Sequence, residues 1–345
     1  MDQSYTVTTA EMTSSLTMAD DANVLPVLGL NTYIFPAIHL TAISTCAVSA
    51  LASSIILIYL FRNIRASFWK ASVGERLVVY LSICDLGFSV SHGADHVVMM
   101  VLRYHTPQPA CTIIAYVVQE FTLGQSLIVN IAAVSAIIFI VQEKKVSFGC
   151  YDWKLILYAY GFPGVIGAVI GALGYLGPVG AWCFMDLTTA VGRALNTFYI
   201  LAIILVFVVN SICYVIVFVK IRQVGKMMKH FKDAQSRESV KRTRRSAQNM
   251  TLIVLAFLFQ WSLYVSFTLW QFFGSPDIGL LLADVFVCNL GGVFNAVAYT
   301  LMRRAGTGKR YVHKGNVDEK KQSSSPESLS SVTPATSVHM MTDDL

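Results

Sequence analysis

Residues 197–221 read TFYILAIILVFVVNSICYVIVFVKI, and this run carries one charge, Lys220, next to its last residue. About 20 apolar residues in a helix cross a hydrocarbon core of about 30 Å. Comparable runs occur near 34–60, 77–102, 111–141, 155–177, 250–272 and 280–302. The chain is 55% hydrophobic and 13% charged, whereas about a quarter of a soluble domain is charged. The sequence therefore predicts an all-α membrane protein, a bundle of seven transmembrane helices over residues 34–304.

The basic residues indicate which way the chain crosses the membrane. Of the 26 lysines and arginines, 24 lie in alternate loops, at 61–76, 142–154 and 220–248 and after Met302. Basic loops stay in the cytoplasm, so we expect an extracellular N-terminal tail over 1–33 and a cytoplasmic tail over 305–345. The first 33 residues lack the pattern of a cleavable signal peptide, so the first run is expected to target the chain. The net charge of +6 reflects topology, and we expect no nucleic-acid partner.

Two of the seven cysteines are expected on the oxidising side of the membrane. Cys46, Cys84, Cys213 and Cys288 fall within apolar runs, and Cys150 falls in a cytoplasmic loop. Cys111 and Cys183 remain, and they have no other extracellular partner, so the sequence predicts a disulfide between them. The alternative is two free thiols. The disulfide would tie the start of the third run to the loop between the fourth and fifth runs.

Polar side chains recur at helical spacing on two of the runs. Residues 77–102 carry one such stripe, made of Ser82, Asp85, Ser89, His92 and His96, with Asp95 beside it. Residues 111–141 carry another, made of Gln119, Thr122, Ser126 and Asn130, with Glu120 one position away. Two stripes of this kind can face each other across a polar interior, although hydroxyls and amides also simply hold membrane helices together.

Ionisable groups within the runs are candidates for function because they are costly in a membrane. The alternative for Asp85, Asp95, Glu120 and Asp284 is a protonated acid in a structural hydrogen bond. We expect an extracellular ligand to bind near His92, Asp95, His96, Glu120 and Trp270. Because imidazole titrates at about pH 6.5 in water, the ligand could be a proton, sensed by His92 and His96 together with His39 and His105.

Residues 288–304, CNLGGVFNAVAYTLMRR, place polar side chains in the last apolar run. Asn295 and Tyr299 are one helical turn apart, and Gly291 and Gly292 permit close helix approach and bending. These side chains can exchange hydrogen-bond partners when the bundle rearranges, and a static network is the alternative. The residues expected to form this switch network are Asp85, Asn130, Trp261, Asn289, Asn295 and Tyr299.

Residues 220–248 hold ten bases and two acids, and their composition favours a helix. We therefore expect the fifth and sixth runs to extend beyond the bilayer as helices. Such a basic segment attracts anionic lipid and also suits a cytosolic partner. The residues expected to face this partner are Arg222, Lys241, Arg242, Arg244 and Arg245. The Ser/Thr-rich tail is expected to be disordered and to offer phosphorylation sites at Ser323, Ser324, Ser325 and Ser328.

Over residues 34–304 the topology, the two extracellular cysteines and the basic third inner loop resemble those of a G-protein-coupled receptor. LSICDLG, around Asp85, is similar to the family's Leu-x-x-x-Asp-Leu pattern, and NAVAY is similar to its Asn-Pro-x-x-Tyr motif, with Ala296 in place of proline. GFPG, GAWCFMDL and the pair FGSPDIG and NLGGVFNA look more like the cyclic-AMP-receptor-like group of orphan receptors, which lies between the rhodopsin-like and the secretin and adhesion receptors.

The resemblance implies a multi-pass receptor of the plasma membrane. It would sense an extracellular ligand and activate a heterotrimeric G protein when the sixth helix swings outward. It also implies arrestin as a partner of the phosphorylated tail, and neither catalysis nor a cofactor. VSAIIFIVQEKK, near the inner end of the third run, has no arginine in the helix, so the usual ionic lock is not expected. FQWSLY lacks the familiar proline, so Trp261 and Tyr264 are approximate counterparts of that region.

Three other classes of membrane protein share parts of this pattern. An opsin needs a lysine inside the membrane for a Schiff base, and no run carries one at mid-depth. A proton- or ion-coupled transporter is the main alternative, because His92, Asp95, Glu120 and Asp284 could relay protons, although we find no internal repeat. A membrane metal hydrolase could use the two histidines of HGADH, but no third ligand is visible and we expect no metal.

Overall fold

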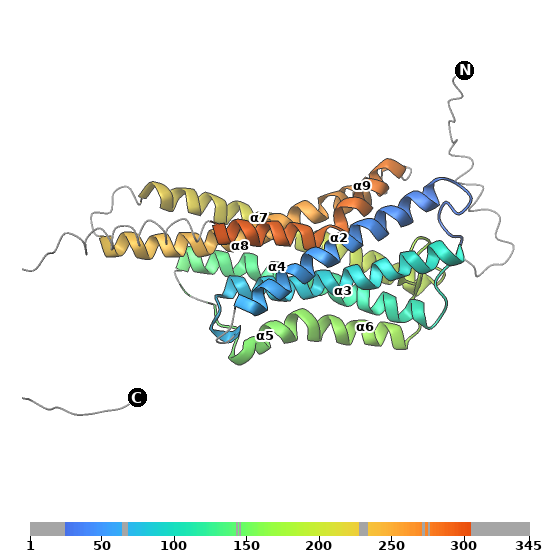
Figure 1. Ribbon diagram of the computed structural model, residues 1–345, viewed down its shortest axis with the longest axis horizontal. Coiled ribbons are helices and arrows are strands. Elements are labelled where there is room, and N and C mark those ends of the chain that lie inside the picture. The colour runs from blue at the N-terminus through green and yellow to red at the C-terminus, as the bar shows by residue number, and fades with distance from the viewer. Residues whose placement is uncertain are drawn as a thin grey trace, which may run out of the picture. The chain divides into compact units, whose positions relative to one another are not determined.

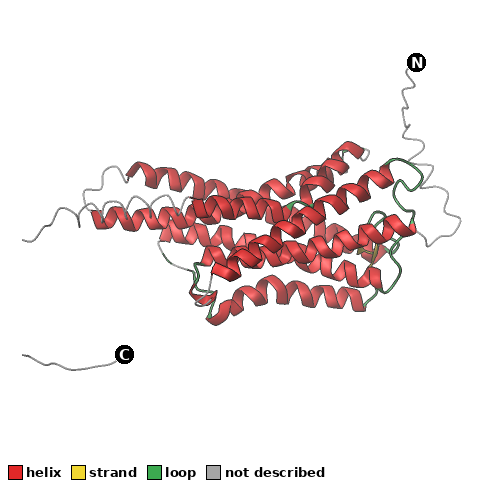
Figure 2. Ribbon diagram, in the orientation of Figure 1, coloured by secondary structure: helices red, strands yellow, loops and turns green. Residues whose placement is uncertain are grey.

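The computed structural model describes residues 25–63, 68–142, 144, 146–227, 234–270, 273–274 and 277–304, and for residues 70, 227 and 234–246 it describes the backbone alone. Most of the described chain is helical (Figure 2). Long helices lie side by side in a bundle (Figure 1), namely α2 (Ile34–Asn63), α3 (Val73–Leu102), α4 (Ala110–Gln142), α7 (Ala190–Met227) and α8 (Ala234–Trp270). The predicted all-α membrane fold is confirmed.

Within the described residues, six helical segments are long and apolar enough to cross a membrane, and a bent pair makes a seventh if it is one span. The pair consists of α9 (Ile278–Cys288) and the helix Gly291–Arg304, which meet at an angle of 49°. Large apolar side chains point outward from the bundle, as on α7, where Leu201 and Leu205 are 50% and 63% exposed. Such exposure suits contact with lipid and would be costly in water.

The fourth span, Cys150–Ala172, lies five residues earlier than the predicted run 155–177 and is less regular than a single α-helix. It begins with η2 (Cys150–Asp152) and α5 (Trp153–Ile156), continues through a π-helical turn, η3 (Leu157–Gly161), and ends with α6 (Phe162–Ala172). Gly174 has a φ of +76°, and this left-handed conformation ends the helix. A hairpin that the sequence did not predict follows, with β1 (Leu176–Pro178) antiparallel to β2 (Cys183–Met185). The predicted end at residue 177 was therefore wrong.

The second span begins earlier than the predicted residue 77. Ser72 caps the first turn of α3 by accepting a hydrogen bond from Glu75 N, and the Glu75 side chain accepts one from Ser72 N. This reciprocal arrangement satisfies backbone N–H groups that a helix start would otherwise leave unpaired. The apolar run alone does not include these polar first residues, so hydrophobicity located the start too late.

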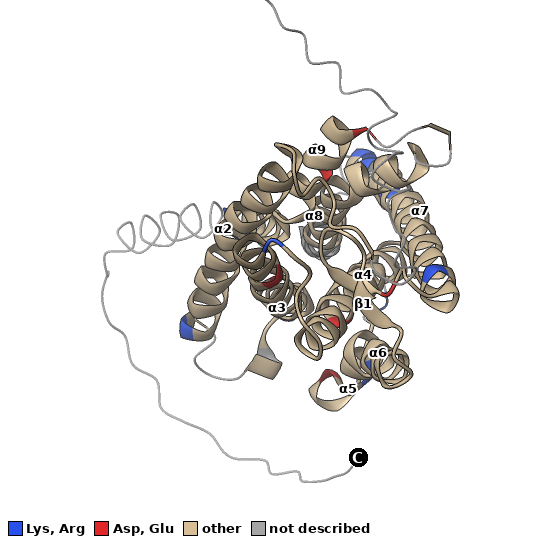
Figure 3. Cartoon of the chain, turned by 90° about the vertical axis from the view of Figure 1, so that its right-hand side faces the viewer, with Lys and Arg blue, Asp and Glu red and all other residues tan. Residues whose placement is uncertain are grey.

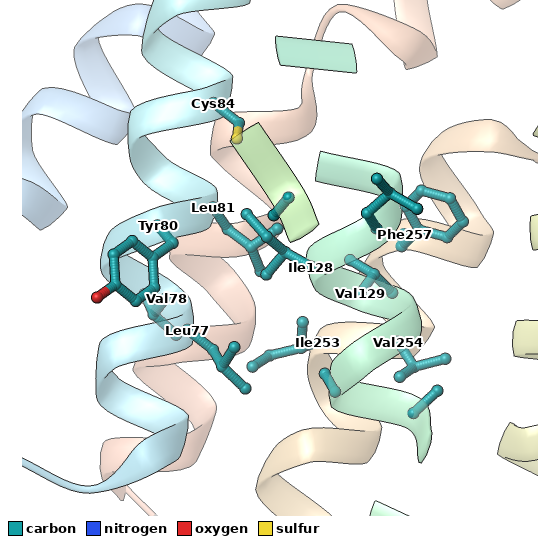
Figure 4. Packing of buried hydrophobic residues seen from close by; sticks show 14 of the residues in the cluster. Leu77, Val78, Tyr80, Leu81, Cys84, Ile128, Val129, Ile253, Val254 and Phe257 are labelled. Carbon is teal, nitrogen blue, oxygen red and sulfur yellow. The ribbon is translucent and has the colours of Figure 1, made fainter. Parts of the chain in front are cut away.

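The centre of the bundle is packed around α4, which contacts α3, α6, α7 and α8. Figure 3 shows these helices surrounding α4, with few charged positions among them. The main apolar cluster joins Leu77 and Leu81 of α3, Ile128 of α4, and Ile253 and Phe257 of α8 (Figure 4). Each of these side chains is at most 2% exposed. This packing fixes the helices whose polar residues form the sites described below.

The fifth and sixth spans extend as long helices, as predicted. α7 continues to Met227, and α8 begins at Ala234, well before the apolar stretch from residue 247 onward. The side chains of Lys241, Arg242, Arg244 and Arg245 lie outside the described part of this extension. The N-terminal residues 1–24 and the C-terminal residues 305–345, including the serines predicted to be phosphorylated, also lie outside the described residues.

Candidate functional site

Asp85 of α3 accepts hydrogen bonds from two other helices. Gln125 Nε2 of α4 donates to Asp85 Oδ1 at 2.8 Å, and Asn295 Nδ2 of the last helix donates to Asp85 Oδ2 at 2.6 Å. Asp85 is 3% exposed, so these bonds replace water at both carboxylate oxygens. The sequence had placed Asp85 and Asn295 in one network, and the structure brings them into direct contact.

Gln260 extends this contact to α8. Gln125 Nε2 also lies 3.0 Å from Gln260 Oε1, and Gln260 Nε2 donates to Cys288 O at 2.9 Å. Cys288 is the last residue of α9, directly before the bend. We call Asp85, Gln125, Gln260 and Asn295 the Asp85 network. It joins three spans to the helices on both sides of the bend.

Two glycines allow the bent segment to approach this network. A Cβ at position 291 would lie 2.5 Å from Gln260 Nε2 and 2.7 Å from Asp85 Oδ1. At position 292 a Cβ would lie 2.2 Å from Ser53 Oγ of α2, and Gly292 N donates to Ser49 Oγ at 2.9 Å. Only glycine leaves room for these contacts. The bend is therefore packed against both α2 and the Asp85 network.

Of the other residues predicted to belong to the switch network, Trp261, Asn289 and Tyr299 are buried and Asn130 is half-buried. Trp261 of α8 is 5% exposed, and its ring contacts those of Phe257 and Tyr264. Trp261 Nε1 and Asn289 Nδ2 are buried and have no hydrogen-bond partner among the described residues. Asn130 donates to Asn210 of α7 at 3.2 Å, in a separate pair, and Tyr299 is buried in the main apolar cluster.

The two ends of the bundle differ. We call the end that holds the cysteine bridge the disulfide end and the opposite end, with Arg76 and Arg222, the basic end. Cys111 Sγ and Cys183 Sγ are bonded at 2.02 Å, which joins the start of α4 to strand β2, as the sequence predicts. Thr112 Oγ1 of α4 also donates to Leu176 O of strand β1. The hairpin is thereby fixed to α4.

Asp95 fixes the same hairpin to α3. Its Oδ2 accepts a hydrogen bond from Cys183 N at 2.6 Å, and its Oδ1 accepts one from Thr106 Oγ1 at 2.5 Å. Asp95 is fully buried. Both carboxylate oxygens are thus occupied by the protein, so in this arrangement Asp95 positions the hairpin and does not face an open site.

His92 and His96, which the sequence grouped with Asp95, lie together with a third histidine. His39 of α2 contacts His96, and His96 contacts His92, through ring nitrogens. Trp182 of the hairpin loop covers both rings of α3, with centroids 5.8 and 6.3 Å away. His96 therefore contacts one histidine within HGADH, His92, and one on another helix, His39.

The remaining predicted ligand contacts lie apart from these histidines. Glu120 faces α6, where its Oε2 would lie 3.3 Å from a Cβ at Gly164. Trp270 is at the end of α8 and is 51% exposed. A hollow of about 250 Å³ also opens at the disulfide end, between the loop 104–108, Leu25, Pro178 and Thr188. His105 lines it, and its Nε2 donates a hydrogen bond to Leu25 O at 2.8 Å.

An ion pair that the sequence did not suggest lies at the basic end. Arg76 Nε and Nη2 donate to the two carboxylate oxygens of Asp152 at 2.6 and 3.1 Å, and Tyr80 also donates to Asp152. Asp152 and Tyr151 have φ values of 54° and 57°, which are unfavourable for residues other than glycine. The pair holds this strained turn against α3. Arg222 of α7 is exposed, with its guanidinium over the Phe218 ring.

Sequence reasoning missed Gln125, Gln260 and the partner of His96. Gln125 is next to the predicted stripe, and Gln260 is next to Trp261. The sequence feature that could have identified both is a polar amide inside an apolar run. Within the described residues, no group of three or more histidine, cysteine or acidic side chains is arranged to hold a metal ion. The two histidines of HGADH contact each other instead.

Comparison with known proteins identifies the fold. No family model matches the chain, and no curated protein matches it in sequence. Among solved structures, the chain is similar to squid rhodopsin, with a TM-score of 0.60 and 16% sequence identity over 85% of this chain and 92% of the rhodopsin chain. The helices described here are therefore arranged as in rhodopsin, and the chain has a rhodopsin-like fold.

Proposed function

We propose that this protein is a G-protein-coupled receptor that senses an extracellular ligand and activates a heterotrimeric G protein by rearranging its helix bundle. The observation that carries the proposal is the Asp85 network, which joins α3, α4 and α8 to both sides of a bend in the last span. A signalling bundle needs a polar contact that several spans share and that can change when they move.

Two features of this region favour alternative arrangements. The regular helical hydrogen-bond pattern breaks at the bend, where the N–H groups of Asn289 and Leu290 both donate to Val287 O, so the two halves can change their angle. Trp261 Nε1 and Asn289 Nδ2 are buried donors without partners among the described residues. Because an unpaired buried donor is costly, another arrangement that pairs these groups gains free energy. We infer that activation exchanges the hydrogen-bond partners of the network.

The disulfide end is proposed to face outward and to receive the ligand. A disulfide persists in an oxidising environment, and the basic loops favour the cytoplasm. His92 and His96 are the proposed ligand contacts. Asp95 contributes by holding the hairpin over them. Glu120 and Trp270, which lie apart in this arrangement, stay predictions as ligand contacts.

The basic end is proposed to bind the G protein. The helical extensions of α7 and α8 carry Arg222, Lys241, Arg242, Arg244 and Arg245. At the same end, the ion pair between Arg76 and Asp152 fixes the loop before α5 against α3. Arrestin would bind on the same side after phosphorylation of the tail serines.

Nucleotide exchange on a panel of purified G proteins tests the proposal. Membranes that contain the wild-type chain should accelerate exchange on one of them, and the variant Arg244→Ala, Arg245→Ala should lose this acceleration. Arg193→Ala is the matched control, because it removes an exposed arginine at the disulfide end. Acceleration that is equal in all three samples would not come from the proposed surface.

A transporter remains the second candidate, because buried histidines and carboxylates occur in the same bundle. Flux of protons or cations into liposomes that contain the chain, without nucleotide exchange on any G protein, would replace the receptor proposal with this one.

A further inference from the structure

Three histidines form a continuous chain between α2 and α3. His39 Nδ1 lies 2.7 Å from His96 Nδ1, and His96 Nε2 lies 3.1 Å from His92 Nε2. The side chains of His39, His96 and His92 are 1%, 0% and 8% exposed. His92 Nδ1, at one end, is buried without a hydrogen-bond partner among the described residues. We call these residues the histidine chain.

The two contacts restrict where protons can be. A neutral imidazole donates through one nitrogen and accepts through the other. His96 uses both nitrogens, so when all three rings are neutral it donates to one neighbour and accepts from the other. A proton that enters at either end of the histidine chain can be passed to His96, which then donates to both neighbours. The histidine chain can therefore gain one proton and keep both contacts.

The groups packed around the histidine chain on α2, α3 and the hairpin loop are aromatic. Phe35 lies 4.3 Å from His39, and Phe88 lies 5.0 Å from His92, between ring centroids. Trp182 covers His92 and His96, and residues 179–185 around it carry no charge. Aromatic and apolar surroundings disfavour a buried cation more than water does.

The charged groups on the neighbouring elements are engaged elsewhere. On α3, Asp95 binds Thr106 and Cys183 N, and Arg103, which follows α3, lies 5.9 Å from the Phe35 ring and donates to Leu30 O. On α9, Asp284 accepts from Cys288, and on α4, Glu120 faces α6. His105 contacts Leu25 O. No carboxylate in the described part of the protein hydrogen-bonds to the histidine chain, so this closed arrangement favours neutral rings.

We propose that the histidine chain is a proton-binding site and that the proton is the extracellular ligand of the receptor. This rests on the proposed function above. An arrangement in which α2 and α3 separate at the disulfide end would expose the rings to water and bind protons more tightly than the closed one. Acid would then favour the open arrangement by this difference in affinity.

The size of the effect follows from simple titration. A ring that titrates at about pH 6.5 when open, and stays neutral when closed, shifts the equilibrium about tenfold between about pH 7.5 and about pH 5.5. Two or three rings that open together would multiply this factor. Even one ring is enough to change the populations of two states that differ by a few kcal/mol at most.

Trp182 provides a readout that needs no G protein. Its ring lies against His92 and His96, so a protonated imidazole or a separation of α2 from α3 would change its fluorescence. The experiment uses the full chain in nanodiscs and follows the difference between wild type and Trp182→Phe during titration from about pH 7.5 to about pH 5.5. We expect a reversible change of this difference signal in wild type. His39→Gln and His96→Gln should abolish it, and His105→Gln, which changes a histidine outside the histidine chain, should keep it.

Each result decides the proposal. A wild-type signal that does not change with pH overturns it, and so does a change that persists in both His39→Gln and His96→Gln. His92→Phe is a further variant for the case in which either glutamine variant fails to fold, because a phenyl ring fits between Phe88 and Trp182. Loss of the pH response in folded His92→Phe supports the proposal, and a retained response overturns it.

Nucleotide exchange separates this proposal from the proposed function. If acid accelerates exchange in wild type and His105→Gln but not in His96→Gln, both stand. A Trp182 response with no exchange on any G protein would support the proton-binding site and contradict the proposed receptor function. Exchange with no Trp182 response at any pH leaves a receptor whose ligand is not the proton.

Discussion

The hydrogen bond between Asp85 and Asn295 should make a measurable contribution to stability. It joins α3 to the last helix at 2.6 Å inside a buried network. Hydrogen bonds between membrane helices contribute about 0.6 kcal/mol on average and up to about 1.7 kcal/mol. This bond is short and involves a carboxylate, so we expect a coupling energy above this average, about 1 to 2 kcal/mol.

A double-mutant cycle isolates this energy. Asp85→Ala, Asn295→Ala and the double variant are compared with wild type by reversible SDS-induced unfolding in mixed micelles. The double variant should lose about 1 to 2 kcal/mol less than the sum of the two single losses. The same cycle on Asp85 and Asn130 is the control, because Asn130 bonds to Asn210 and not to Asp85. Additive losses for Asp85 and Asn295, within experimental error, would refute the reasoning.

Two further substitutions test the bend and the ion pair. Gly292→Ala places a Cβ 2.2 Å from Ser53 Oγ and 2.5 Å from Ser49 O. This overpacking should lower the unfolding free energy by about 1 to 3 kcal/mol in the same assay. Gly74→Ala is the control and should not lower it, because no atom lies within 4 Å of the new Cβ. Arg76→Ala leaves Asp152 buried without its charged partner and should cost about 3 to 5 kcal/mol, while the double variant Arg76→Ala, Asp152→Ala should recover part of this. Equal stability of the single and double Arg76 variants would contradict that explanation.

The spans were predictable because each repeats the same physical requirement over many residues. A run such as 197–221 has to be apolar along its whole length to cross lipid, so its composition is sufficient evidence. Asp85 and Asn295 were recognisable for the opposite reason, because a polar group in such a run is costly and needs a partner. The sequence did not show which residues these polar groups contact. Gln125 and Gln260 are 135 residues apart in sequence, and periodicity within one helix says nothing about which residue of another helix it meets.

The pattern of hydrophobicity also could not predict local backbone features. The bend at residues 289 and 290 lies inside an apolar run, and the sequence indicated only that Gly291 and Gly292 would permit bending. His39 was recognised as a titratable residue but not as a neighbour of His96, since this contact depends on the relative rotation of α2 and α3. No pattern in the sequence marks Asp152, which is buried and bonded to Arg76, 76 residues earlier in the chain.

The position of Asp95 limits which parts of the bundle can move independently. Its carboxylate binds the hairpin at the same residue, Cys183, that is covalently joined to α4. The disulfide end of α3, the hairpin and the start of α4 therefore form one mechanical unit, and a displacement of any one of them carries the other two. Relative motion at this end is left to the helices outside this unit. Spin labels on the disulfide end of α3 and on the start of α4 should then keep their mutual distance while their distances to a label on α2 change.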